Sequence, residues 1–339
     1  MNAAGVSVVI CCYNGQDRLP ETLRHLALQQ LPEGGCLQLV LVDNCCTDAT
    51  VQLTRRWQQD DGRQISLSVI SEPQPGLTHA RIAGIRAAEY ETIVLCDDDN
   101  WLAADYCRRA WQILSEHADV ALAGGCSTAV PEVTPPEWFA EISGAWAVGE
   151  SDYIGYLQGP EAFLRGAGLV VRRSAFLQLL DSGFRFLASD RRGSSLNSGG
   201  DAEISKEIGR MGQRLYFDCR LRLQHWIPAG RLTRQYALRL WQGFGAGTIA
   251  GDAERVFSQP QAGIKSVIRR SWYYQLLRGC LNLLQVLRLH PLWHPRDPRP
   301  ALVWCSRLGR LKAIWEMGKG YQDQIEQRVK WLAGRSRKL

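Results

Sequence analysis

Three consecutive aspartates, Asp97, Asp98 and Asp99, follow the short apolar run of residues 93–96. A run of this length between polar residues predicts a buried strand. Carboxylates crowded at a strand end repel one another, and each disfavours ionisation of its neighbours. A divalent cation relieves that repulsion, since Mg²⁺ is often held by one or two carboxylates together with substrate phosphates. The triplet therefore predicts either a metal–nucleotide site or an acidic loop that opens the next helix, where Asp is also favoured.

The elements around the triplet alternate between strand and helix over the first 125 residues. Apolar runs predict strands at residues 6–12, 37–42, 65–70 and 92–96, with amphipathic helices between them at 16–30, 47–59 and 77–90. Such alternation predicts an α/β fold with a mostly parallel central sheet flanked by helices. Ligands of these sheets bind beyond the carboxyl ends of the strands. We therefore expect Asn14, Asp43 and the Asp triplet to share one edge.

The second half of the chain is less regular. Residues 127–165 are rich in Pro, Gly and Trp and predict a long irregular connection. Short strands are expected at 167–171 and 220–224, with helices at 175–180 and 201–211 and a polar loop at 188–200. From residue 231 onward the pattern predicts helices.

Composition favours a reduced protein without a membrane span. The chain has 339 residues and 11 Cys, including the vicinal pairs Cys11-Cys12 and Cys45-Cys46, which suit packed free thiols better than a disulfide framework. The first residues lack the basic region of a signal peptide, and no stretch reaches about 18 uncharged apolar residues. We therefore expect a reducing, cytoplasmic location.

The formal charge of +6 is unevenly distributed. Residues 265–339 hold sixteen Lys and Arg against four Asp and Glu, so the remainder of the chain is acidic. A basic tail on an acidic body predicts contact with something anionic. Helix packing, an anionic inner-leaflet membrane surface and oligomerisation all remain open for this tail. Nucleic acid is not expected, because the tail carries no nucleic-acid-binding motif.

Four motifs in order resemble a family 2 glycosyltransferase with the GT-A fold, of the type that serves bacterial polysaccharide biosynthesis. They are Tyr13-Asn14 after the first strand, Val42-Asp43 through Thr50 after the second, Ala80-Arg81 in a helix, and Asp97-x-Asp99 after the fourth strand. The resemblance covers roughly residues 5–250. It implies a GT-A domain over residues 1–250, divided into a nucleotide-sugar-binding half (1–125) and an acceptor and catalytic half (126–250). Residues 251–339 would form a basic helical extension.

The resemblance also implies roles for individual residues. The metal, Mg²⁺ or Mn²⁺, would be bound by Asp99, with Asp97 beside it and His225 approaching from the second half. Residues assigned to the donor nucleotide are Cys11, Cys12, Tyr13, Asn14, Asp43, Arg81, Asp97 and Asp98. The paired cysteines depart from the family pattern, and a thiol is a weaker hydrogen-bond partner than a hydroxyl.

A carboxylate for catalysis is expected near residue 200. Gly199-Gly200-Asp201 resembles the family's Gly-Glu-Asp motif at the start of a helix, although Gly replaces Glu. Asp201 is our choice for the catalytic base and Glu203 is the alternative, while a simple helix cap is the other interpretation of Asp201.

The resulting hypothesis is an inverting, metal-dependent, hexosyltransferase-like enzyme of cell-surface polysaccharide synthesis. It would move a sugar from a nucleotide-diphosphate donor to a saccharide or lipid-linked saccharide, in the cytoplasm or peripherally at the inner face of the membrane. Two alternatives remain. A sugar-nucleotidyltransferase would normally carry a Gly-rich basic loop after its first strand, whereas residues 14–16 are neither Gly-rich nor basic. A non-catalytic nucleotide-sugar-binding scaffold docked on the membrane would use Asp43 and Asp99 but not Asp201.

Overall fold

The structure is a computed structural model that describes residues 4–159, 162–187, 190–191, 195–258, 268, 271–287 and 297–336. The chain divides into two compact units. The first consists of Met1–Thr134, Ser143–Leu179 and Ile204–Ala229. The second consists of Pro135–Ile142, Leu180–Glu203 and Gly230–Leu339.

The first unit is built on a mixed sheet that has nine strands within the described residues. The strands are β1 (Gly5–Cys12), β2 (Cys36–Asp43), β3 (Ser66–Ser71), β4 (Thr92–Cys96), β5 (Asn100–Leu102), β6 (Val120–Pro131), β7 (Ile154–Leu157), β8 (Leu169–Arg172) and β9 (Arg214–Ile227). Their order is β3-β2-β1-β4-β8-β6-β9-β5, and β7 also pairs with β9. The expected α/β sheet flanked by helices is thereby confirmed.

The register of the parallel strands aligns their carboxyl ends. Cys12, the last residue of β1, pairs with Asp43, the last residue of β2. On the other side of β1, Ile10 pairs with Cys96, the last residue of β4. The loops that follow these three strands, including the Asp triplet, therefore leave the sheet at the same edge, as the sequence predicted.

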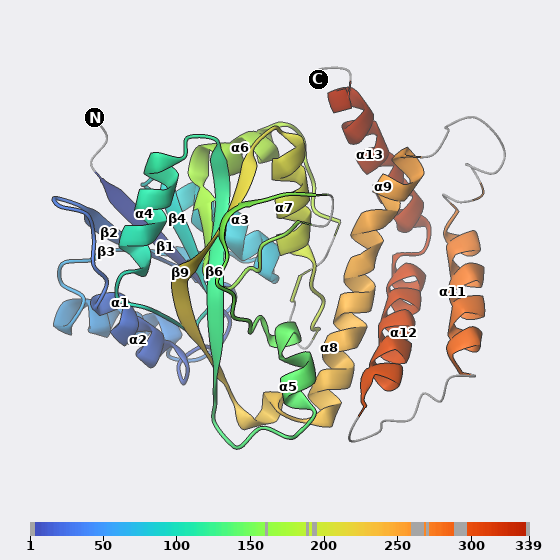
Figure 1. The fold of residues 1–339 in the computed structure, drawn as a ribbon, viewed down its shortest axis with the longest axis horizontal. Coiled ribbons are helices and arrows are strands. Elements are labelled where there is room, and N and C mark those ends of the chain that lie inside the picture. The colour runs from blue at the N-terminus through green and yellow to red at the C-terminus, as the bar shows by residue number, and fades with distance from the viewer. Residues whose placement is uncertain are drawn as a thin grey trace. The chain divides into compact units, whose positions relative to one another are not determined.

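Helices cover both faces of this sheet (Figure 1). α1 (Leu19–Ala27), α2 (Thr50–Asp60) and α4 (Tyr106–Glu116) share one core with the alternate residues Val6, Val8 and Ile10 of β1. α3 (Leu77–Ala87) packs against β1 and β2 from the other face, because a Cβ at Gly84 would lie 2.3 Å from Val9 and 3.0 Å from Val42. Strand residues alternate between faces, so β1 is buried on both sides.

The prediction of a long irregular connection at 127–165 holds only in part. Strand β6 extends to Pro131, and the short helix α5 (Phe139–Ile142) and strand β7 lie within the segment. Two glycines just before the segment allow β6 to approach β9 closely. A Cβ at Gly125 would lie 2.1 Å from the carbonyl oxygen of Leu221, and the register of β6 against β9 shifts between Gly124 and Cys126. Such glycines mark an irregular close approach of two strands.

Strand β9 is also longer than the predicted segment 220–224, since it spans Arg214–Ile227 and continues through His225. The predicted helices at 175–180 and 201–211 correspond to α6 (Arg173–Asp181) and α7 (Gly200–Arg210). Of the predicted loop at 188–200, residues 188–189 and 192–194 lie outside the described residues.

The second unit contains the helices expected beyond residue 231: α8 (Arg234–Gly247), α9 (Asp252–Phe257), α11 (Trp272–Leu287), α12 (Arg299–Met317) and α13 (Lys319–Ser336). Helices α8, α12 and α11 run side by side (Figure 1). Glycines permit close approach, since a Cβ at Gly245 would lie 1.7 Å from the carbonyl oxygen of Ser306. Part of the predicted 251–339 extension, residues 259–267, 269–270, 288–296 and 337–339, lies outside the described residues.

Candidate functional site

The loops after β1 and β2 are joined by hydrogen bonds at the carboxyl edge. Asn14 has a positive φ of 51°, a conformation that Asn adopts more readily than most residues. Its Oδ1 accepts the amide of Thr47 at 2.7 Å, and its own amide donates to the sulfur of Cys46 at 3.3 Å. Asp43 in turn accepts the amide of Cys46 at 2.8 Å. Asn14 and Asp43 therefore lie in one bonded pair of loops, as predicted.

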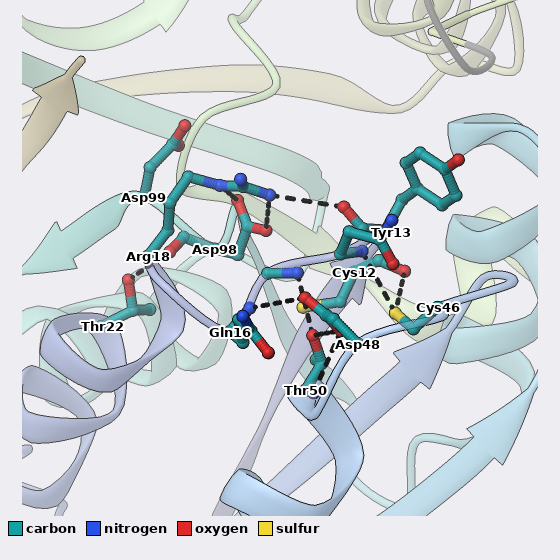
Figure 2. Close-up of polar contacts among 12 residues, drawn as sticks. Cys12, Tyr13, Gln16, Arg18, Thr22, Cys46, Asp48, Thr50, Asp98 and Asp99 are labelled. Atoms are coloured by element: carbon teal, nitrogen blue, oxygen red, sulfur yellow. Dashed lines mark hydrogen bonds and ion pairs between the residues drawn. The ribbon is translucent and has the colours of Figure 1, made fainter.

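A second set of hydrogen bonds joins Gly15 and Gln16, just before α1, to the start of α2 and the segment before it (Figure 2). The amide of Gly15 donates to the hydroxyl of Thr50 at 2.8 Å, and the amide of Gln16 donates to Asp48 at 3.1 Å. The Gln16 side chain accepts the amide of Ala49 at 3.0 Å. These reciprocal bonds hold the two loops in one arrangement before any ligand binds.

Three cysteines at this edge, Cys11, Cys12 and Cys46, have raised thiol pKa values. Burial raises the pKa of Cys11 to about 12 and the pKa of Cys46 to about 11, and it also raises the pKa of Cys12. All eleven cysteines are free. Tyr13, by contrast, is 53% exposed, so its ring offers an accessible flat surface at this edge. The thiols can serve as weak hydrogen-bond partners, whereas anionic thiolate ligands are disfavoured.

The Asp98 carboxylate forms an ion pair with Arg18. The Arg18 guanidinium donates to Oδ1 of Asp98 at 3.0 Å and to Oδ2 at 2.6 Å, and the hydroxyl of Thr22 donates to the Asp98 carbonyl at 2.9 Å. Both Arg18 and Thr22 belong to the beginning of α1, so this pair anchors the Asp loop to the helix (Figure 2). Burial raises the pKa of Asp98 to about 6, while Arg18 opposes that rise. Direct nucleotide contact by Asp98 stays a prediction.

Asp99 points away from the Asp98 carboxylate (Figure 2) and faces His225. Its Oδ1 lies 3.5 Å from Nε2 of His225, and only 3% of Asp99 and 6% of His225 are exposed. The two residues are brought together by the pairing of β5 with β9, in which Asn100 lies opposite His225. Strand β9 thus places the His225 side chain beside Asp99.

The opposite nitrogen of His225 fixes the orientation of the ring. Nδ1 lies 2.7 Å from the carbonyl oxygen of Trp146, an acceptor, so Nδ1 carries the proton. The chain turns immediately afterwards at Ala147, whose φ of 58° costs roughly 1–2 kcal/mol for a residue with a Cβ. In the neutral ring, the Nε2 lone pair is therefore directed toward a carboxylate.

A carboxylate oxygen and an imidazole lone pair that face each other form a donor pair for a cation. The side-chain oxygen Oδ1 of Asn100, next to Asp99, is buried and lacks a hydrogen-bond partner, while its Nδ2 donates to Oδ1 of Asp99 at 3.2 Å. Within the described ranges, no group of three or more His, Cys, Asp and Glu side chains is arranged to hold a metal ion. The Asp99 oxygen and the His225 nitrogen are of the donor types that a divalent cation accepts, and substrate oxygens would complete its shell.

Asp97 and Arg81 lie at the more open side of the triplet. The Asp97 side chain is 39% exposed, and its Oδ1 lies 3.9 Å from the guanidinium of Arg81. Gly166 lies against Arg81, since a Cβ there would be 2.8 Å from Nη2. The guanidinium is largely buried, at 9% exposure, and this close packing holds it beside Asp97. The pair combines an accessible carboxylate with a fixed cation, and contacts to a ribose and a phosphate stay a prediction.

Asp201 and Glu203 belong to the second unit, in the first turn of α7. Oδ1 of Asp201 accepts the amide of Ala202 at 2.9 Å, and the residue is half-buried. Glu203 is buried and its carboxylate accepts the amide of Leu187 at 3.0 Å and the guanidinium of Arg328 at 2.5 Å. Glu203 is thus engaged in a buried ion pair, which favours Asp201 over Glu203 for proton transfer.

Three contributors could not be identified from the sequence: Arg18, Trp146 and Arg328. Arg18 acts through its partner Asp98, and Arg328 acts through Glu203, so each is recognised only when the partner is known. Trp146 contributes a backbone carbonyl, which any residue could supply. Local sequence patterns carry no signal for contacts of this kind.

Comparisons with known proteins agree with this fold. The model of glycosyl transferase family 2 matches residues 7–180, just over half of the chain. The chain belongs to glycosyl transferase family 2. The matched region contains the loops after β1, β2 and β4 and excludes Asp201 and His225.

Two curated relatives match part of the chain. EpsH of Bacillus subtilis (strain 168), named as a glycosyltransferase, is 25% identical over 122 residues, which are 36% of this chain and 34% of EpsH. The poly(ribitol-phosphate) beta-N-acetylglucosaminyltransferase TarS of Staphylococcus aureus (strain Mu50) is 28% identical over 117 residues, 34% of this chain and 20% of TarS. The matched segments therefore span about a third or less of these relatives.

A solved structure shares the fold. The mannosyltransferase PcManGT from Pyrobaculum calidifontis, in complex with GDP-Man and Mn²⁺, superposes with a TM-score of 0.51 at 17% identity. The superposition covers 98% of this chain and 86% of that one. At this identity, the likeness supports the GT-A-like architecture alone.

Proposed function

We propose that the chain is an inverting glycosyltransferase that moves a sugar from a nucleotide-diphosphate donor to a saccharide or lipid-linked saccharide acceptor. The observation that carries the proposal is the facing pair Asp99 and His225, located beside Asp97 at the carboxyl edge of a family 2 sheet. Parallel α/β sheets bind nucleotides at this edge. We place the process in cell-surface polysaccharide biosynthesis.

The donor nucleotide would lie across the joined loops of β1 and β2. Asp43 would accept a hydrogen bond from the base or the ribose, and the exposed ring of Tyr13 would cover an apolar face. Cys11, Cys12 and Asn14 would contribute mainly through the backbone, because their side chains are protonated thiols or already bonded. Arg81 would face the diphosphate.

Asp99 and His225 would hold Mg²⁺ or Mn²⁺, with Asp97 at the accessible side. When bound, such an ion offsets the negative charge that develops on the departing diphosphate. The chain's own contribution is to fix the imidazole through Trp146 and to keep Asp98 away from the donor pair through Arg18. As a result, an oxygen of Asp99 and a nitrogen of His225 would be available to the ion.

The acceptor hydroxyl would lose its proton to the carboxylate of Asp201. A bond forms between the acceptor oxygen and the anomeric carbon while the bond from that carbon to the diphosphate oxygen breaks, and the nucleoside diphosphate leaves. A single displacement of this kind inverts the anomeric configuration. Glu203 would position the helix start through its bond to Leu187 and its ion pair with Arg328.

One relative and the charge of the C-terminal tail support the proposed acceptor and location. The name of TarS describes a poly(ribitol-phosphate) acceptor, and that relative supports a polymer or its lipid-linked precursor here as well. A lipid-linked acceptor gives a purpose to the basic C-terminal tail, which would associate peripherally with the inner face of the membrane in the cytoplasm. The division into a domain at 1–250 and an extension at 251–339 belongs to this proposal.

The test is nucleotide release from a panel of sugar nucleotides in the presence of Mn²⁺, with wild type and the Asp201→Asn variant. We expect the release rate to fall by about a hundredfold or more in the variant, as for loss of a general base, with nucleotide binding preserved. The matched variant Asp181→Asn, at the end of α6, should keep full activity. Unchanged turnover in Asp201→Asn would reject the base, and binding without turnover by wild type would favour the non-catalytic scaffold.

A further inference from the structure

Helix α11 of the second unit carries an apolar stripe on its exposed face. Tyr273, Leu277, Leu281 and Leu284 are each 54–64% exposed. Their spacing of four, four and three residues places them on one side of the helix. Single exposed apolar residues are common, whereas a continuous line of four on one helix marks an interaction surface.

The opposite side of α11 accounts for its packing within the unit. A Cβ at Gly279 would lie 2.9 Å from Leu311 of α12, and Arg307 of α12 donates to the carbonyl of Asn282 at 2.7 Å. Leu276 packs against the buried cluster that includes Ile314 and Tyr321. Because α11 packs within the unit through this opposite side, the exposed stripe is not needed for that packing.

In the sequence, α11 and the segments on either side of it carry charges of one sign. Between Glu254 and Asp297 the sequence contains no Asp or Glu. It contains seven cations in that interval, at positions 255, 265, 269, 270, 278, 288 and 296. Arg278 is on α11 itself and exposed, at the polar border of the helix. A helix with an apolar face and only basic charges suits an anionic interface.

We propose that the exposed face of α11, defined by Tyr273, Leu277, Leu281 and Leu284, docks on the surface of an anionic lipid bilayer. The helix has 16 residues, about 24 Å in length, and would lie in the plane of the interface with these four side chains among the lipids. Within the described residues, no helix has both the length and the apolarity needed to cross a membrane. Surface docking agrees with that finding.

A second copy of the chain is a poorer occupant of this face. Four side chains on one helix offer far less than the roughly 800 Å² per partner of a standard protein interface. A two-fold axis would also bring the same basic sequence against itself, and like charges across an interface oppose association. Anionic headgroups attract that charge instead, by about 1 kcal/mol for each cation near the surface.

This inference extends the proposed function, because it assigns the membrane contact of the tail to one helix face. It is nevertheless tested apart from catalysis. Vesicle binding by the full chain requires no donor or acceptor, so failure to bind and failure to transfer a sugar are separate results.

The experiment is co-sedimentation of the full chain with vesicles of phosphatidylcholine, with and without phosphatidylglycerol. We expect binding to vesicles that contain phosphatidylglycerol and a loss on the order of tenfold or more in the triple variant Leu277→Gln/Leu281→Gln/Leu284→Gln. The variant Arg278→Gln should lose severalfold. Leu28→Gln, which alters an equally exposed leucine of the first unit, should bind as wild type.

Circular dichroism and thermal unfolding verify that the triple variant remains folded, and Leu281→Gln alone, expected to weaken binding severalfold, covers the case in which it does not. Equal vesicle binding by wild type and the stripe variants would overturn the proposal. So would binding that is indifferent to phosphatidylglycerol, or a dimer in light scattering that the stripe variants abolish while vesicles remain unbound.

Discussion

The Nε2 nitrogen of His225 lies 3.5 Å from Oδ1 of Asp99, while the other ring nitrogen is held by the carbonyl of Trp146. This relationship joins a residue of β9 to the Asp triplet after β4, more than a hundred positions earlier in the chain. Both side chains are buried, and the carbonyl directs the imidazole lone pair at the carboxylate. An oxygen donor and a nitrogen donor that face each other in this way suit a metal cation between them.

The first prediction concerns His225→Ala. Loss of the imidazole removes one of the two donors, so the Mn²⁺ concentration needed to support nucleotide binding should rise on the order of tenfold or more. The measurement is a Mn²⁺ titration of the melting temperature at a fixed concentration of nucleoside diphosphate. An unchanged Mn²⁺ requirement would exclude His225 from the site.

His25→Ala is the matched control. The Nδ1 of His25 also faces a carbonyl, that of Leu102 at 3.2 Å, and its Nε2 lies 3.5 Å from Oε1 of Glu21. The geometry resembles that of His225, but Glu21 is on the more exposed surface of α1. His25→Ala should leave the Mn²⁺ requirement unchanged, so an equal effect of both variants would point to general destabilisation.

The second prediction is that Arg18→Met destabilises the first unit. The side chains of Arg18 and Asp98 are 25% and 11% exposed, so removal of the cation leaves a carboxylate largely buried without its partner. We expect a loss of about 2 kcal/mol in the free energy of unfolding, below the value for a fully buried pair because solvent screens Arg18. Thermal or urea unfolding measures it.

Arg24→Met provides the comparison on the same helix, since Arg24 forms an exposed ion pair with Glu21. That variant should unfold like wild type. If Arg18→Met were equally harmless, the Asp98 pair would not anchor the Asp loop to α1.

The Asp triplet shows how far the sequence reached and where it stopped. Strand patterns placed all three carboxylates at the correct edge, because parallel register follows from alternation of strands and helices. The separate environments of Asp98 and Asp99 depend on Arg18 and His225, which approach from α1 and β9. The approach of His225 was expected from the family resemblance, whereas the Arg18–Asp98 pair has no local periodicity that a sequence pattern can reveal.

A third prediction concerns Arg328 of α13. Its guanidinium contacts Glu203 at 2.5 Å and stacks over the Phe184 ring at 4.2 Å, and both ion-pair side chains are 4% exposed. Arg328→Met should cost about 3 kcal/mol in stability and lower turnover, because Glu203 would remain buried without its cation. Lys330→Met, an exposed position on the same helix, should do neither.

A double-mutant cycle separates the ion pair from other effects of Arg328. Combining Arg328→Met with Glu203→Gln should destabilise less than the sum of the two single variants, since the second change removes the stranded charge. Strict additivity would show that Arg328 does not act through Glu203.

The fourth prediction follows from the raised pKa values of Cys11 and Cys46. The thiolate is the reactive form, and pKa values of about 12 and 11 mean that almost none is present at pH 8. Iodoacetamide should therefore label both residues slowly at pH 8, with a rate that rises about tenfold per pH unit. Mass spectrometry follows the labelling, with exposed Cys280 as the accessible control. Rapid labelling of Cys46 at pH 8 would contradict the burial of its thiol.

Strands β6 and β9 show a different limit of the sequence, because β6 was not predicted and β9 is longer than predicted. Gly124 and Gly125 lie within β6, where the second of them permits close contact with the carbonyl of Leu221. Glycine and proline favour loops in isolated patterns, yet here tertiary contact overrides that local preference. This pairing matters for the site, because β9 lies between β6 and β5 and places His225 opposite Asn100, next to Asp99.

The most direct test of the central claim is nucleotide binding to the full chain, with and without Mn²⁺. Wild type should gain several degrees in melting temperature with at least one nucleoside diphosphate or its sugar conjugate, only when Mn²⁺ or Mg²⁺ is present, because ligand binding stabilises the folded state by mass action. Asp99→Asn should lose this shift while its own melting temperature stays close to that of wild type. An equal shift in Asp99→Asn, or no shift of wild type with any nucleoside diphosphate, would contradict the account.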